Sequence, residues 1–126
     1  MGYTAKSVIL RILGNHGDVS FLGIRSVEFK LGGVLIEVNS GNAAFYATSA
    51  SSTHLAEYAF DTSLSKTGVD GAGLSWLTPA GGDPFNQLLI CVFNVPTEFD
   101  EVVVNNCHSS GGYTRRGAKT VEIIIS

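Results

Sequence analysis

An alternating segment followed by two glycines restricts the fold more than any other feature of this chain. In "IRSVEFKL" (24–31) apolar and polar side chains alternate, so one face of an extended strand carries Val27, Phe29 and Leu31. The opposite face carries Ser26, Glu28 and Lys30. The glycine pair then leads into "VLIEV" (34–38), which predicts a β-hairpin. Because a strand with one wet side needs a core beneath its dry side, the pattern favours a layered β fold.

Short apolar runs between Gly, Asn, Asp and Ser recur along the chain, whereas helical periodicity is nearly absent. Further strands are predicted at 7–13, 86–93, 100–106 and 118–126. The run from Leu88 to Phe93 contains no polar residue, which predicts a central strand covered on both faces.

The middle of the chain, from Asn39 to Pro84, is mostly small and polar. Within it, segments 43–47 and 54–60 are apolar enough to pack, and the second could form one helical turn. About eight short strands without crossover helices predict an all-β sandwich.

Composition limits both the size of the fold and the class of partner. The 126 residues fit one domain, and 44% hydrophobic against 15% charged residues predicts a compact fold with a thinly charged surface. The formal net charge is −3 and the cations are mostly scattered, which argues against nucleic-acid binding. Neither a membrane-spanning apolar run nor a signal-peptide pattern occurs, so we expect a soluble protein made without a cleaved signal.

Several motifs follow one another in a characteristic order. A Gly/Asn/Asp loop and the alternating strand precede an alanine- and serine-rich stretch that ends in "AFD" (59–61). Trp76 and the apolar "LLICVF" come next, and "RGAKTVEIIIS" (116–126) closes the chain. This order resembles the galactose-binding-like, or discoidin-like, jelly-roll modules over most of the chain. The resemblance implies a jelly-roll β-sandwich of about eight antiparallel strands, occupying residues 1–126.

Modules of this kind are usually not enzymes. They bind glycans, lipids or proteins through loops at one end of the sandwich, some hold a structural calcium ion, and they occur in carbohydrate-binding modules and in phage tail and fibre proteins. The Met1 start and the short chain favour a whole small gene product over an appended module. We therefore expect a non-enzymatic structural or attachment component of a virus particle, assembled in the host cytoplasm.

Tail, baseplate, fibre and capsid-decoration roles fit such a component equally well. Its partners would be copies of itself or other virion proteins. The alternative is a free-standing lectin-like module that binds a cell-surface glycan through its end loops.

Four residues are candidates for contact with a ligand: Tyr113, Arg115, Trp76 and His108. The glycine and serine neighbours of Tyr113 suggest an end loop, where its ring could stack on a sugar. A core role is favoured for Trp76 over an exposed platform. Arg115 could bind a carboxylate or phosphate, although a solvated position is the simpler interpretation.

A second group of residues has expected structural roles. Asp61 follows an apolar segment, where its carboxylate can accept backbone amide hydrogen bonds in an Asx-turn or helix cap; a calcium ligand is the alternative. The family pattern implies that Arg116 pairs within the domain and that Gly117 belongs to the same closing motif. Weak calcium candidates are Asp18, Asp70 and Asp83 in glycine-containing loops, without EF-hand spacing.

No constellation for catalysis is visible, since the three histidines lie far apart in sequence and no Gly-x-Ser-x-Gly motif occurs. We expect no cofactor. The two cysteines could form a bridge, but Cys91 lies within "LLICVF", where a thiol usually serves as a small buried hydrophobe, and we favour that role over a disulfide with Cys107.

Overall fold

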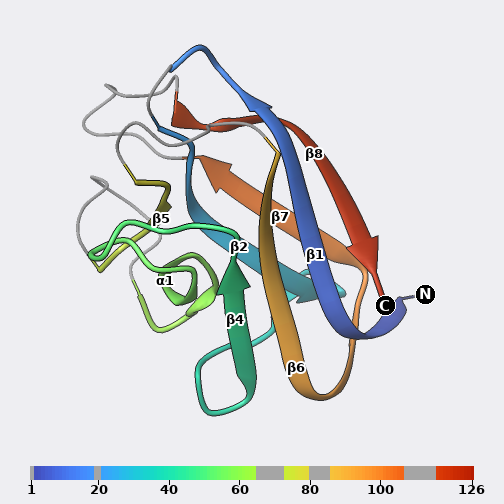
Figure 1. The fold of residues 1–126 in the computed structure, drawn as a ribbon. Helices are drawn as coiled ribbons and strands as arrows, with labels where there is room; N and C mark the ends of the chain where they lie inside the picture. Colours follow the sequence, from blue (N-terminus) through green and yellow to red (C-terminus); the bar gives the residue numbers. More distant parts are fainter. Residues whose placement is uncertain (1, 19–20, 65–72, 80–85, 107–115) are drawn as a thin grey trace.

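The computed structural model describes residues 2–18, 21–64, 73–79, 86–106 and 116–126, which form two antiparallel sheets packed face to face (Figure 1). Sheet A has the order β4-β6-β1-β8, with bounds Ala43–Ala47, Gln87–Phe99, Tyr3–Asn15 and Ala118–Ile125. In sheet B, β2 (Gly23–Leu31) pairs with β7 (Glu101–Asn106) on one side and with β3 (Val34–Leu35) and β5 (Trp76–Leu77) on the other. The predicted all-β sandwich is confirmed, with eight strands among the described residues.

The core lies between the two sheets and is centred on a group of aromatic rings. Phe29 of β2 lies 5.4 Å from Phe93 and 5.2 Å from Phe99 between ring centroids. The Phe60 ring is stacked nearly parallel to the Phe29 ring, with 6.3 Å between the centroids. Phe60 belongs to the single described helix, α1 (Glu57–Phe60), whose buried residues pack against the core. The helical turn expected within 54–60 is thus present and closes this side of the sandwich.

The predicted hairpin forms at Gly32 and Gly33, with φ values of 60° and 81°. Two consecutive positive φ angles are typical of the type I′ turn that joins twisted antiparallel strands, and glycine adopts them at little cost. Lys30 then pairs with Leu35, and Leu31 with Val34. The returning strand β3 has only two residues, so it is shorter than the predicted segment 34–38.

The alternation of β2 holds only in its middle. Val27 and Phe29 are buried as predicted, but Leu31 is 38% exposed because it lies beside the turn. On the face predicted to be wet, Ser26 is fully buried and its hydroxyl accepts a hydrogen bond from Asn105 Nδ2 at 2.7 Å. Arg25 is also buried and donates to the Leu74 carbonyl oxygen. Side chains and loops therefore cover the first half of β2 on both faces.

Strand β6 is central, between β4 and β1, but the prediction that both of its faces are covered was wrong. Leu89, Cys91 and Phe93 point into the core and are buried. Leu88, Ile90 and Val92 alternate with them on the outer face and are only partly buried. Sheet A is one of the two layers of the sandwich. Its outer face is apolar, and no other described element packs over that face.

One further property concerns membranes. The helix α1 has four residues. In the described part of the chain, no helix is long and apolar enough to cross a bilayer.

Candidate functional site

Arg116 pairs within the domain at one end of the sandwich. Its Nε lies 3.5 Å from Asp18 Oδ2, and its guanidinium carbon lies 4.3 Å from the centroid of the Phe21 ring. The other carboxylate oxygen of Asp18 accepts the Phe21 backbone amide at 2.8 Å. Asp18, a calcium candidate in the sequence, thus ties its own loop to the segment that opens β8.

The Asn106 side chain lies close to the backbone at Gly117. Asn106 at the end of β7 donates from Nδ2 to the Ala118 carbonyl at 3.1 Å, and its Oδ1 accepts the Ala118 amide at 3.0 Å. A Cβ atom on Gly117 would lie 2.7 Å from the Asn106 side chain. Glycine is therefore required here, and the Arg116–Gly117 motif joins the ends of the two sheets.

Trp76 is fully buried in β5, and its indole Nε1 donates to the Ser49 carbonyl at 2.8 Å. A ring in this position has no free face for a sugar. Of the two roles considered for Trp76, its location matches the packing role.

Asp61 ends α1 and begins the next turn. Its amide donates to the Glu57 carbonyl at 2.9 Å. Its Oδ1 accepts the Ser63 amide at 2.9 Å and the Ser63 hydroxyl at 2.6 Å. The amide contact two residues on is the Asx-turn that the sequence predicts, so the Asp61 carboxylate has a structural task.

The remaining candidate residues lie outside the described residues: Tyr113, Arg115, His108, Asp70, Asp83 and Cys107. Within the described ranges, no three His, Cys, Asp or Glu side chains gather in a way that could hold a metal ion.

Cys91 is a free thiol with no exposed surface. Burial raises the pKa of this thiol from 9.0 to about 12, because the thiolate is poorly solvated in the core. A thiol of this kind is unreactive at neutral pH, which fits the packing role expected for it.

This pKa difference predicts a loss of stability in alkaline solution. Above pH 9.0 the unfolded chain releases a proton from Cys91 that the folded chain retains until about pH 12. The free energy of unfolding should therefore fall with rising pH in this window, by up to about 1.4 kcal/mol per pH unit, and Cys91 should not contribute to the pH dependence below it. Urea unfolding of the wild type and Cys91→Ala across the window measures the difference. Equal slopes of unfolding free energy against pH for the two proteins would contradict the raised pKa of Cys91.

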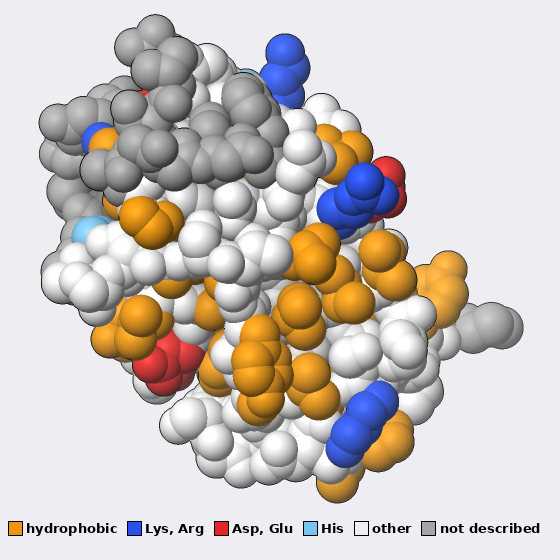
Figure 2. All heavy atoms as spheres, in the orientation of Figure 1, with side chains coloured by type: hydrophobic (Ala, Val, Ile, Leu, Met, Phe, Trp, Pro, Cys, Tyr) orange, Lys and Arg blue, Asp and Glu red, His pale blue; other side chains and the backbone are white. Residues whose placement is uncertain are grey.

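The outer face of sheet A carries a row of apolar side chains that crosses all four strands. Tyr46 of β4 pairs with Ile90 of β6, Ile90 with Ile9 of β1, and Ile9 with Ile124 of β8. We call these four residues the apolar row. Tyr46 is 56% exposed and Ile124 43% exposed. Figure 2 shows hydrophobic side chains gathered over the middle of this face.

Polar residues interrupt the face on both sides of the row. Ser7 lies next to Val92 on one side, and Arg11 lies between Leu88 and Glu122 on the other. The Arg11 and Glu122 side chains form an exposed ion pair at 3.9 Å. An apolar centre with a polar border is the composition of a protein–protein contact rather than of a catalytic site.

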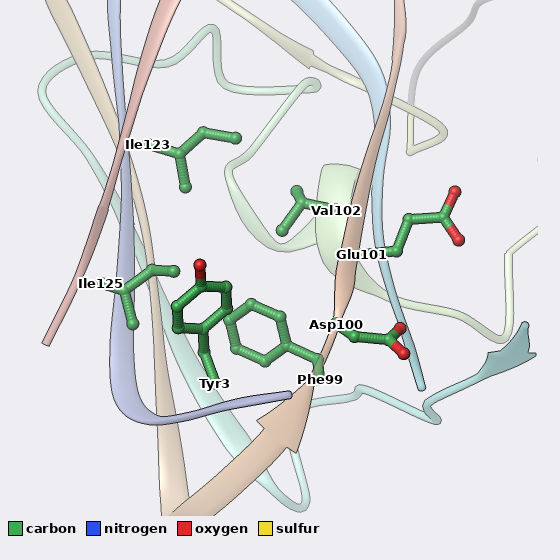
Figure 3. A pocket seen from close by; sticks show the side chains of 7 residues that line it. All are labelled: Tyr3, Phe99, Asp100, Glu101, Val102, Ile123 and Ile125. Carbon is green, nitrogen blue, oxygen red and sulfur yellow. The ribbon is translucent and has the colours of Figure 1, made fainter. Parts of the chain in front are cut away.

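A second apolar feature lies between the sheets, at the side where β7 and β8 are the outermost strands. A cavity of about 420 Å³ is lined there by Tyr3, Phe99, Val102, Ile123 and Ile125. Figure 3 shows these side chains turned toward one another, while the carboxylates of Asp100 and Glu101 point away from them. The cavity therefore offers apolar contact without a charged group for catalysis at its centre.

Sequence reasoning missed both apolar features, although their signals are visible. The unbroken run in β6 and the three consecutive isoleucines of β8 give each strand apolar residues on both faces. In a two-layer fold one of those faces has no partner among the described elements.

Comparison of the chain with protein-family models, curated proteins and solved structures gave no match.

Proposed function

We propose that this protein is a non-enzymatic structural module that associates with other protein surfaces through the outer face of sheet A. The observation that carries the proposal is the apolar row, which crosses the sheet from Tyr46 to Ile124. When a partner removes such side chains from water, the association is stabilised by about 25 cal/mol per Å² of apolar surface buried. The polar border then fixes where the contact ends.

The setting proposed for this association is a virus particle, in a tail, baseplate, fibre or capsid-decoration role. Its support is the order of motifs shared with galactose-binding-like modules, together with the apolar row. A particle component is present in many copies that contact one another through the same repeated surfaces. A small sandwich with an exposed apolar face suits such contacts. The glycan-binding alternative receives less support, because the buried Trp76 removes one of its four candidate contacts.

The test is the mass in solution by light scattering across a concentration series, with and without calcium. We expect the wild type to associate into a closed oligomer. Ile90→Lys should raise the dissociation constant at least about tenfold, because an interface would have to desolvate the added charge.

Val34→Lys is the matched control for this experiment. Val34 is 69% exposed but lies in sheet B, so the added charge should leave the mass unchanged. Far-UV circular dichroism checks that both variants remain folded. A wild type that stays monomeric at the highest concentration, or equal effects of the two substitutions, would overturn the proposal.

A further inference from the structure

Among the described strands, β8 has a free outer edge. β8 pairs with β1 on one side, and in the described part of the chain no strand pairs with its other side. Ser7 and Ser126 exchange two backbone hydrogen bonds, at 2.9 and 3.0 Å. Because hydrogen-bonding direction alternates along a strand, Ile124 directs its backbone groups toward β1, while Ile123 and Ile125 direct theirs outward.

These three isoleucines place apolar side chains on both faces of the β8 edge. Ile124 is the end of the apolar row, while Ile123 and Ile125 are 43% and 38% exposed in the cavity between the sheets (Figure 3). Natural sheets protect such edges with lysine, proline or a bulge, because an open apolar edge recruits another strand. The segment 123–125 contains none of these. Neither its backbone nor its side chains therefore oppose pairing with another strand.

We propose that a second copy of this chain pairs with this edge, β8 against β8 in antiparallel orientation, with the two-fold axis at Ile124. In this register Ile124 lies opposite its own counterpart, and Ile123 lies opposite Ile125 of the second copy. The isoleucine segment reads the same in both directions, so it is its own complement. A foreign strand is not needed to explain the pattern.

The charge pattern of β8 selects this register over its neighbours. With the axis at Ile124, Glu122 lies opposite Ser126, whose hydroxyl is compatible with a carboxylate. With the axis at Glu122, two carboxylates would lie directly opposite each other, which is destabilising. With the axis at Ile123, the Glu122 carboxylate would lie opposite the apolar side chain of Ile124, which cannot form a hydrogen bond with it.

The pairing rests on the proposed function and deepens it, because it gives the unit that presents the outer face: a dimer of two copies. The two sheets A become one eight-stranded sheet, and the apolar rows of the two copies join at Ile124. The joined face is twice as wide as that of one chain. Such a dimer would be the unit that presents the face to further partners.

The first experiment is a disulfide cross-link in a Cys107→Ser background, where Cys91 remains as a buried thiol. Directly opposed residues that do not exchange hydrogen bonds have Cα atoms about 4.5 Å apart, which a disulfide can span. Ile124→Cys should therefore give a covalent dimer on oxidation. Glu122→Cys, on the same strand and face, lies opposite Ser126 and should give none. Equal yields from the two variants would overturn the register.

The second experiment removes the free backbone donor. Ile123→Pro deletes an N–H that points away from β1, so the β1–β8 ladder keeps its hydrogen bonds while the edge loses one. We expect a protein that stays folded by circular dichroism and loses the β8-paired dimer by light scattering. A dimer that survives Ile123→Pro but is lost in Ile90→Lys would overturn the β8 pairing and leave the proposed function standing. A dimer lost in Ile123→Pro and kept in Ile90→Lys would support the pairing, and the effect of Ile90→Lys on assemblies larger than the dimer then tests the outer face separately.

Discussion

Replacing Trp76 with alanine is expected to lower the free energy of unfolding by about 3–5 kcal/mol. The indole is fully buried, and its removal would leave a large cavity between β5 and the core. The loss also leaves the Ser49 carbonyl without the hydrogen bond that the indole N–H donates at 2.8 Å. Because domains are commonly stable by about 5–15 kcal/mol, this loss is a large fraction of the total stability.

Urea unfolding followed by far-UV circular dichroism measures this change, since the substitution removes the single tryptophan of the chain. Trp76→Phe is the matched variant, because it keeps an aromatic ring and deletes only the donor and part of the volume. It should lose less stability than the alanine variant. If Trp76→Ala costs less than about 1 kcal/mol, the ring is not part of the core and the packing role is wrong.

Phe29→Ala is the second substitution with a large expected effect, again about 3–5 kcal/mol. Phe29 contacts the rings of Phe60, Phe93 and Phe99, so one deletion removes edge and stacking contacts to three neighbours. Aromatic pairs contribute about 0.5–1.5 kcal/mol beyond the area that they bury. The substitution should therefore loosen α1 and both sheets together.

Leu31→Ala is the control for Phe29→Ala, because both positions fall on the same face of β2 in the sequence pattern. Leu31 is 38% exposed, and its truncation should cost far less than the Phe29 truncation. Thermal unfolding by calorimetry compares the two variants. Similar losses for both would mean that the alternation of β2, and not the local packing, determines the cost.

The β2–β3 hairpin shows what local sequence can predict. Alternation and two consecutive glycines depend on residues close in sequence, and they correctly predicted the strand, the turn and the buried Phe29. The burial of Ser26 and Arg25 could not be predicted in this way. Their cover comes from Asn105 and from the segment around Leu74, which are far away in the chain.

The apolar run of β6 shows the limit of composition as a guide to burial. A run of this kind reports that both faces are apolar, but it does not report whether a second layer covers each face. Here Leu89 and Cys91 face sheet B, whereas Ile90 faces outward. The number of layers is a property of the whole fold, so the exposed row needed the structure to be recognised.

The candidate site was predicted less completely than the fold. Motif order directed attention to residues 107–117, of which only Arg116 and Gly117 are described, and both connect parts of the domain. The surface row has no motif, because its members come from four strands and meet only through the register of sheet A.

The two ends of the chain lie side by side in Figure 1, and Ser126 is hydrogen-bonded to Lys6 and Ser7. β1 and β8 are antiparallel neighbours, so tension applied between these ends would peel their hydrogen bonds one pair after another. Peeling needs less force than sliding all pairs at once. We therefore expect low resistance to force applied at these two ends and higher resistance to force applied across the sides of the sheets.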